Sequence, residues 1–130
     1  MPYPLAAAVT LLSALLYAAT IVMVGRARWR YGIKAPAIAG HPAFERLHRV
    51  QANTLEQMPV FLPALWLAAI TVSDALAAAL GALFVAFRIL YAVLYLRAAE
   101  ARGYGYGPAA LCMLALWGVA AWGVGRQLLT

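Results

Sequence analysis

Residues 44–59 read FERLHRVQANTLEQMP, and the apolar run FLPALWLAAI follows at residues 61–70. Together they form one long helical stretch whose second half is suited to a membrane and whose first half is not. Ionisable side chains are expensive in lipid and are rarely found facing it. The first half must therefore face protein, water or a ligand, and this requirement organises our interpretation of the whole chain.

The composition places the rest of the chain in or against a bilayer. Of 130 residues, 66% are hydrophobic and 11% are charged, with a mean hydropathy of +0.83. A soluble domain carries about a quarter charged residues, so we predict an integral, multi-pass membrane protein. The net charge of +6 is explained by basic loops at the cytoplasmic face rather than by nucleic-acid binding. The lone Cys112 offers no basis for a disulfide within the chain or for a metal cluster.

Four apolar blocks predict a single all-α domain, a bundle of four transmembrane helices over about residues 3–26, 42–71, 74–102 and 107–128. Pro42 suits the first turn of the second helix, Ser73 is a good N-cap for the third, and the Gly-rich GYGYGP at 103–108 is read as a turn. Basic residues gather in the loop after the first helix and near the turn after the third. The positive-inside rule then makes both loops cytoplasmic and puts the polar half of the second helix on the cytoplasmic side of the membrane.

Helical spacing sorts the polar residues into two stripes. Arg49, Asn53 and Glu56 stand at i, i+4 and i+7 and share one face of the second helix. The third helix carries a second stripe, formed by Arg88, Tyr91, Tyr95 and Arg102. Gln51 lies about 200° from the Arg49 face, so it would contact a neighbouring subunit. A structural Arg49–Glu56 ion pair and a purely packing role for the tyrosines remain the alternatives.

The two stripes predict the chemistry of a ligand. Guanidiniums bind carboxylates through forked hydrogen bonds, and a carboxylate accepts from an ammonium. Such a site suits a small zwitterion with more than one carboxylate and an amino group. A guanidinium beside a bound thiol would lower the pKa of that thiol. The protein could then use a thiol co-substrate as its nucleophile without supplying one of its own.

The stretch at 44–59 resembles the second-helix signature of the MAPEG superfamily, membrane-associated proteins in eicosanoid and glutathione metabolism. The pattern E-R-x-x-R-x-x-x-N-x-x-E-x-x-P is met in register by Glu45, Arg46, Arg49, Asn53, Glu56 and Pro59. FRILYAVLYLRAAEAR, residues 87–102, is similar to the third helix of the branch that contains cysteinyl-leukotriene synthases and microsomal glutathione transferases. The resemblance implies a homotrimer that binds glutathione between subunits and uses no metal.

Matching positions assign roles to individual residues. Glutathione would be held by Arg49, Asn53, Glu56, Arg88, Tyr91 and Tyr95, with Gln51 and Arg28 reaching it from the neighbouring subunit. Arg102 matches the arginine credited with stabilising the thiolate, so it is the predicted catalytic residue. Gln57 departs from the branch, which has a tyrosine there, and the effect of this difference on glutathione binding is left open.

The predicted function is that of a membrane glutathione transferase or peroxidase used in detoxification. A lipophilic electrophile or lipid hydroperoxide would enter from the bilayer. Two alternatives are a non-catalytic lipid-binding or scaffold protein on the same fold, and a small multidrug exporter with Glu56 as the coupling carboxylate. The Ala- and Arg-rich composition suggests a bacterial protein, and hence an inner membrane with the active site facing the cytoplasm.

Overall fold

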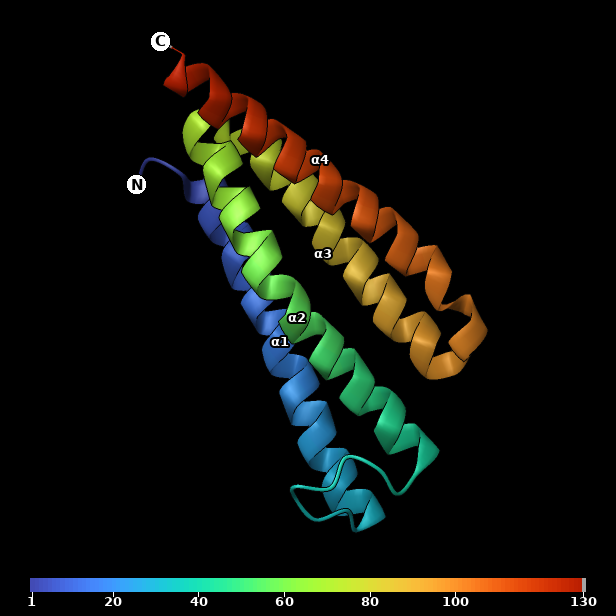
Figure 1. Cartoon of the computed structure of the whole chain (residues 1–130). Helices are drawn as coiled ribbons and strands as arrows, with labels where there is room; N and C mark the ends of the chain where they lie inside the picture. The colour runs from blue at the N-terminus through green and yellow to red at the C-terminus, as the bar shows by residue number, and fades with distance from the viewer. Residues whose placement is uncertain (130) are drawn as a thin grey trace.

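The computed structural model describes residues 1–129 and is entirely helical, as predicted. Four α-helices make up the bundle: α1 (Pro4–Tyr31), α2 (Pro42–Thr71), α3 (Asp74–Arg97) and α4 (Gly103–Leu128). A short 3₁₀ helix, η1 (Ala99–Arg102), joins α3 to α4. The helices α1 and α2 run as one antiparallel pair and α3 and α4 as another (Figure 1). The two pairs splay apart toward the end that carries the α1–α2 loop and η1 (Figure 1).

Local sequence signals explain where the helices begin and end. Pro42 opens α2, and its N-cap His41 accepts a hydrogen bond from the Ala43 amide at 3.2 Å. Ser73 caps α3 by accepting from the Leu76 amide at 3.3 Å, which confirms the predicted N-cap. Gly32 ends α1 in the left-handed region at φ 66°, a conformation that glycine adopts without steric cost.

The larger part of the core fills the half of the bundle away from the α1–α2 loop, and a smaller cluster of Val24, Ala27, Ile33 and Phe44 lies beside that loop. Phe61 of α2 stacks on Phe84 of α3 with ring centroids 4.3 Å apart, and both rings are fully buried beside Leu65 and Leu116. Asp74, the first residue of α3, accepts hydrogen bonds from the Leu5 and Ala6 amides at 3.0 and 2.8 Å. A carboxylate at a helix N-terminus satisfies free amides and complements the helix dipole, so Asp74 ties α3 to the start of α1.

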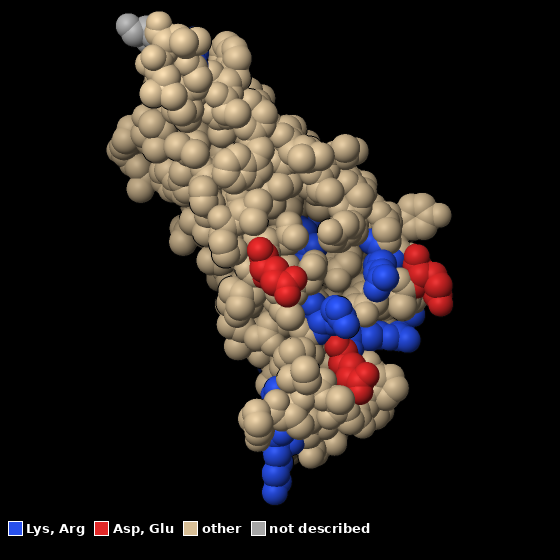
Figure 2. Space-filling model, viewed as in Figure 1, with Lys and Arg blue, Asp and Glu red and all other residues tan. Residues whose placement is uncertain are grey.

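Three segments are long and apolar enough to cross a membrane by length and composition: Pro4–Tyr31, Asp74–Arg97 and Ala99–Leu128. The outer surface of the bundle is rich in exposed large apolar side chains, including Leu11, Leu15, Leu111 and Leu114, as a lipid-facing surface should be. The helix α2 is equally long at 30 residues but is not one of the three, since its first half carries the charged residues at 45–56. Lys, Arg, Asp and Glu gather over the half of the visible face that includes this stretch (Figure 2).

The α3–α4 junction differs from the sequence prediction. The third helix ends at Arg97 rather than continuing to Arg102, because Ala98 is extended at φ −149° and ψ 111°. The fourth helix begins at Gly103 rather than near 107, so the whole of the presumed GYGYGP turn is helical. Gly105 allows close packing: a Cβ there would lie 2.6 Å from the Cα of Tyr91, whereas a Cβ on Gly103 or Gly107 would meet nothing within 4 Å. Small residues let membrane helices approach in this way.

Candidate functional site

Two adjoining pockets lie along the polar half of α2. The inner pocket has a volume of about 300 Å³ and is lined by Arg49, Asn53, Tyr91, Arg102, Gly103 and Tyr106. The outer pocket, about 370 Å³, is lined by Ile38, Ala39, Glu45, His48, Arg49, Ala52, Asn53 and Glu56. Arg49 and Asn53 line both, so the two pockets meet at these side chains. Small-molecule sites commonly occupy about 300–1,000 Å³, and the pair falls within that range.

The predicted stripe on α2 explains this arrangement. Arg49, Asn53 and Glu56 lie on one face because α2 is uninterrupted between them, and all three line the outer pocket. No ion pair joins Arg49 to Glu56 within the described residues 1–129, and the surfaces of both residues are exposed in the single chain. The structure therefore does not contain the purely structural ion pair that was the alternative reading of this face.

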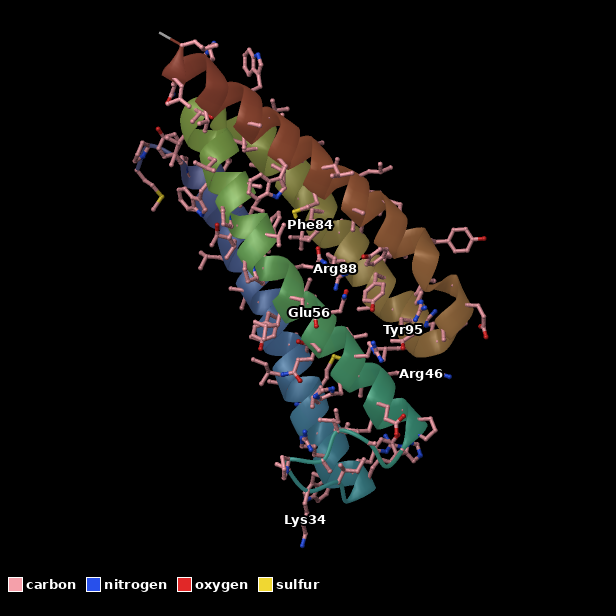
Figure 3. The ribbon with its side chains drawn as sticks, in the orientation of Figure 1. Lys34, Arg46, Glu56, Phe84, Arg88 and Tyr95 are labelled. Atoms are coloured by element: carbon pink, nitrogen blue, oxygen red, sulfur yellow. The ribbon has the colours of Figure 1, made fainter. Side chains whose placement is uncertain are left out.

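Arg88 occupies the buried floor between α2 and α3. Its residue surface is only 3% exposed, and Figure 3 shows its side chain pointing from α3 toward α2. Its Nη2 donates to Thr54 Oγ1 at a long 3.4 Å, and its guanidinium lies 4.4 Å from the Tyr91 ring centroid. A buried guanidinium needs several acceptors, and this one has a single side-chain hydroxyl.

Two buried polar atoms at the site have no hydrogen-bond partner, Asn53 Oδ1 and Arg88 Nε. Leaving a buried donor or acceptor unpaired costs about 1–3 kcal/mol, so unpaired groups of this kind need an explanation. One is an acceptor and the other a donor, and Asn53 lines both pockets. A polar ligand that both donates and accepts would satisfy them.

The aromatic side of the inner pocket is a stack of tyrosines beside Arg102. Tyr91 stacks on Tyr95 with centroids 5.8 Å apart, and Tyr106 of α4 lies 6.1 Å from Tyr91 at a tilt. The Arg102 guanidinium is 5.5 Å from the Tyr95 ring centroid. Contacts of this kind between a guanidinium and an aromatic face are attractive and hold Arg102 over the pocket.

Arg102 lines the inner pocket, but it belongs to a different element from the one that its spacing predicts. The spacing predicts a position on a continuous third helix, whereas Arg102 lies at the end of η1, where the chain turns back into α4. The turn returns its side chain to the pocket lined by Tyr91. Sequence reasoning missed other lining residues, namely Gly103, Tyr106, Glu45 and His48. Gly103 and Tyr106 fall in the stretch that is predicted to be a turn. Of the four residues, only Tyr106 has a side chain that could have indicated a contact with the pocket.

Gln51 and Arg28 line neither pocket of this chain. Arg28 Nη1 donates to the Ala37 carbonyl at 2.6 Å, and its guanidinium lies 4.9 Å from the Phe44 ring centroid. Gln51 is half-buried on another face of α2. Their assignment to a neighbouring subunit's site stays a prediction. Within residues 1–129, no cluster of three or more His, Cys, Asp or Glu could hold a metal ion.

The fold and site define a class: a helical integral membrane protein with a cationic, aromatic pocket at one end of its bundle. Residues 6–122 match the MAPEG family, so the chain belongs to that family.

Three relatives illustrate the similarity. An uncharacterized protein of Synechocystis is 47% identical over 110 residues, 85% of this chain and 80% of its own. Human microsomal glutathione S-transferase 2 is 37% identical over 116 residues, 88% and 79% of the two chains. Leukotriene C4 synthase of Cavia porcellus is 37% identical over 113 residues, 87% and 73%. A cyanobacterial relative is consistent with a bacterial origin.

Proposed function

We propose that this protein is a membrane glutathione transferase that joins glutathione to a lipophilic electrophile. The observation that carries the proposal is the inner pocket, where Arg49, Asn53, Tyr91 and Arg102 converge from three elements. The names of its relatives, a glutathione S-transferase and a leukotriene C4 synthase, support the same reaction class.

The donors and acceptors of the two pockets fit glutathione. Glutathione carries two carboxylates, one ammonium, two amides and a thiol. The guanidinium of Arg49 in both pockets matches one carboxylate, and Glu56 of the outer pocket matches the ammonium. Arg88 lines neither pocket and would meet a second carboxylate only from its buried position between α2 and α3. Asn53 Oδ1 and Arg88 Nε, both unpaired in the chain, would gain a donor and an acceptor from the ligand. Tyr95 completes the set as the ring that holds Arg102 in place.

Arg102 is the proposed catalytic residue. When bound, glutathione supplies the sulfur nucleophile. The guanidinium of Arg102 favours a negative charge beside it and so lowers the pKa of that thiol from about 8.5. Arg102 is exposed in the single chain, and its charge would act more strongly where neighbouring subunits exclude water from the site. Holding the two reactants together adds a proximity contribution, and the second substrate would arrive from the surrounding lipid.

The proposed protein is a homotrimer, and the exposure of the site supports its burial by neighbouring subunits. Arg49 and Glu56 are both exposed in the single chain although α2 packs within a membrane bundle. Charged groups left facing lipid cost about 2.5 kcal/mol or more each at the bilayer centre. Neighbouring subunits that cover this face would remove the cost and bring their Gln51 and Arg28 to the rim. In this arrangement α2 is the fourth transmembrane helix.

The orientation follows from the basic loops. The α1–α2 loop and η1 lie at the same end of the bundle (Figure 1). The loop carries Lys34 and follows the three arginines at the end of α1, and η1 carries Arg102. The positive-inside rule places that end on the cytoplasmic side, so the two pockets would take up glutathione from the cytoplasm. In a bacterium the membrane would be the inner one.

The test is turnover of the purified protein with glutathione. We expect conjugation of chlorodinitrobenzene by the wild type, loss of most of the rate in Arg102→Ala, and retention in Arg97→Ala, since Arg97 is an exposed arginine that lines neither pocket. A lipid hydroperoxide run in parallel separates peroxidase from transferase activity. Glutathione binding without any turnover would contradict the proposal and favour the scaffold alternative. Proton-coupled export abolished by Glu56→Gln would favour the exporter.

A further inference from the structure

A second group of hollows lies on a different face of α2 from the glutathione site. An apolar hollow of about 160 Å³ is formed by α1, α2 and α3, with Leu16, Ala19, Met23, Val50, Ile89 and Val93 among its lining residues. Two further hollows adjoin it at the end nearer the α1–α2 loop. Met23 and Leu47 line all three, so the hollows form one continuous groove, here called the apolar groove.

The groove changes character along its length. Its inner part is almost wholly apolar, with Ile89 and Val93 47% and 40% exposed. Its outer part is lined by Arg26 and Arg30 from α1 and by Arg46 from α2. Figure 3 shows Arg46 projecting from the start of α2 toward the side on which α3 ends. An apolar channel therefore opens onto three guanidiniums.

The cationic rim lies at the depth of a lipid headgroup. Trp29, 90% exposed, and Tyr31 flank Arg30, and exposed aromatics of this kind mark the membrane–water interface. From Leu16 to Arg30 the groove follows α1 for about 20 Å, at 1.5 Å per residue. This span reaches from the interface well into one leaflet, the region that an acyl chain occupies.

We propose that the apolar groove binds one anionic phospholipid, with an acyl chain along Leu16, Met23 and Val93 and its phosphate on the three arginines. Charge complementarity selects this occupant, because guanidiniums bind phosphate through paired hydrogen bonds. Basic pockets between transmembrane helices on the cytoplasmic side recognise anionic headgroups in this way. The site uses none of the residues assigned to glutathione and does not depend on the proposed function.

The test is native mass spectrometry of delipidated protein titrated with phosphatidylglycerol or with phosphatidylcholine of the same acyl chains. We expect the wild type to retain phosphatidylglycerol selectively. Each arginine near an anionic surface raises the binding affinity by about a factor of five. The triple variant should therefore bind phosphatidylglycerol on the order of a hundredfold more weakly; it combines Arg26→Gln, Arg30→Gln and Arg46→Gln. Replacing the same three arginines by lysine should keep part of the preference, because lysine retains the charge but not the paired hydrogen bonds, and Arg97→Gln should keep all of it.

A second pair of variants tests the apolar part. Ala19→Phe fills the groove, whereas Ala18→Phe makes the same change at an exposed neighbour that does not line it. Only the first should reduce lipid retention. Equal binding of the two lipids by the wild type, or equal phosphatidylglycerol binding by wild type and triple glutamine variant, would overturn the proposal. So would an Ala19→Phe variant that keeps its lipid and changes only its oligomeric state, because the groove would then be covered by a second copy.

Discussion

Gly105 controls how closely α4 approaches α3 beside the proposed glutathione site. In the Gly105→Ala variant, the added Cβ would lie 2.6 Å from the Cα of Tyr91 and 2.9 Å from the carbonyl oxygen of Phe87. Both are backbone atoms of α3 and cannot rotate away. The backbone nitrogen of Tyr91 lies nearer still, and ordinary contacts begin at 3.4 Å, so α4 must move outward by about 1 Å at this point.

The chain offers a matched control two residues along the same helix. A Cβ on Gly107 would meet nothing within 4 Å. Both substitutions gain about the same helix propensity, about 1 kcal/mol for alanine over glycine, and this gain cancels when the two variants are compared. Forcing an extra methyl into a packed contact costs about 1–3 kcal/mol. We therefore expect Gly105→Ala to be less stable than Gly107→Ala by that amount.

The assay is equilibrium unfolding of both variants in the same detergent micelles, followed by glutathione titration. Tyr106 and Gly103 of α4 line the inner pocket, so the outward shift should also weaken glutathione binding in Gly105→Ala and leave it unchanged in Gly107→Ala. Equal unfolding free energies for the two variants would refute the close approach of α4 to α3.

Three further predictions separate ligand-binding residues from structural ones. Asn53→Ala should lower glutathione affinity about tenfold with little change in stability, because Asn53 Oδ1 has no partner in the chain. Calorimetry measures the affinity and equilibrium unfolding measures the stability. A large loss of stability would argue against a role of Asn53 in binding. Asp74→Ala should have the opposite effect and leave glutathione affinity unchanged. It should lower the free energy of unfolding by about 1–2 kcal/mol, because two amides of α1 lose their acceptor. Thr54→Val removes the hydroxyl that accepts from Arg88 and should cost about 1–3 kcal/mol; a stability equal to that of the wild type would mean that this hydrogen bond contributes nothing.

The polar face of α2 could be predicted from the sequence because α2 is one unbroken helix. Residues at i, i+4 and i+7 share a face wherever the helical period holds, and Arg49, Asn53 and Glu56 accordingly line one pocket. The presence of Arg88 near that face also followed from its apolar helix, since a buried cation needs polar neighbours. The family could be predicted from the same residues.

The α3–α4 junction could not be predicted in this way. The helical period alone extends the third helix to Arg102, five residues past the true end of α3 at Arg97. The glycines of residues 103–108 predict a turn, but they lie within α4, and Gly105 among them packs closely against α3. Local sequence does not distinguish these two uses of glycine, because the decisive contact is with Tyr91 on another helix. The proposed roles of Gln51 and Arg28 involve a neighbouring subunit, so the pattern of a single chain does not reveal them.

Ultraviolet detection of the glutathione thiolate after rapid mixing measures the proposed role of Arg102. We expect a thiolate signal in the wild type and in Arg97→Ala at a pH below the ordinary thiol pKa. We expect no such signal in Arg102→Ala, although calorimetry should show that this variant still binds glutathione. An equal thiolate signal in Arg102→Ala and in the wild type would contradict the role of Arg102 and the mechanism built on it.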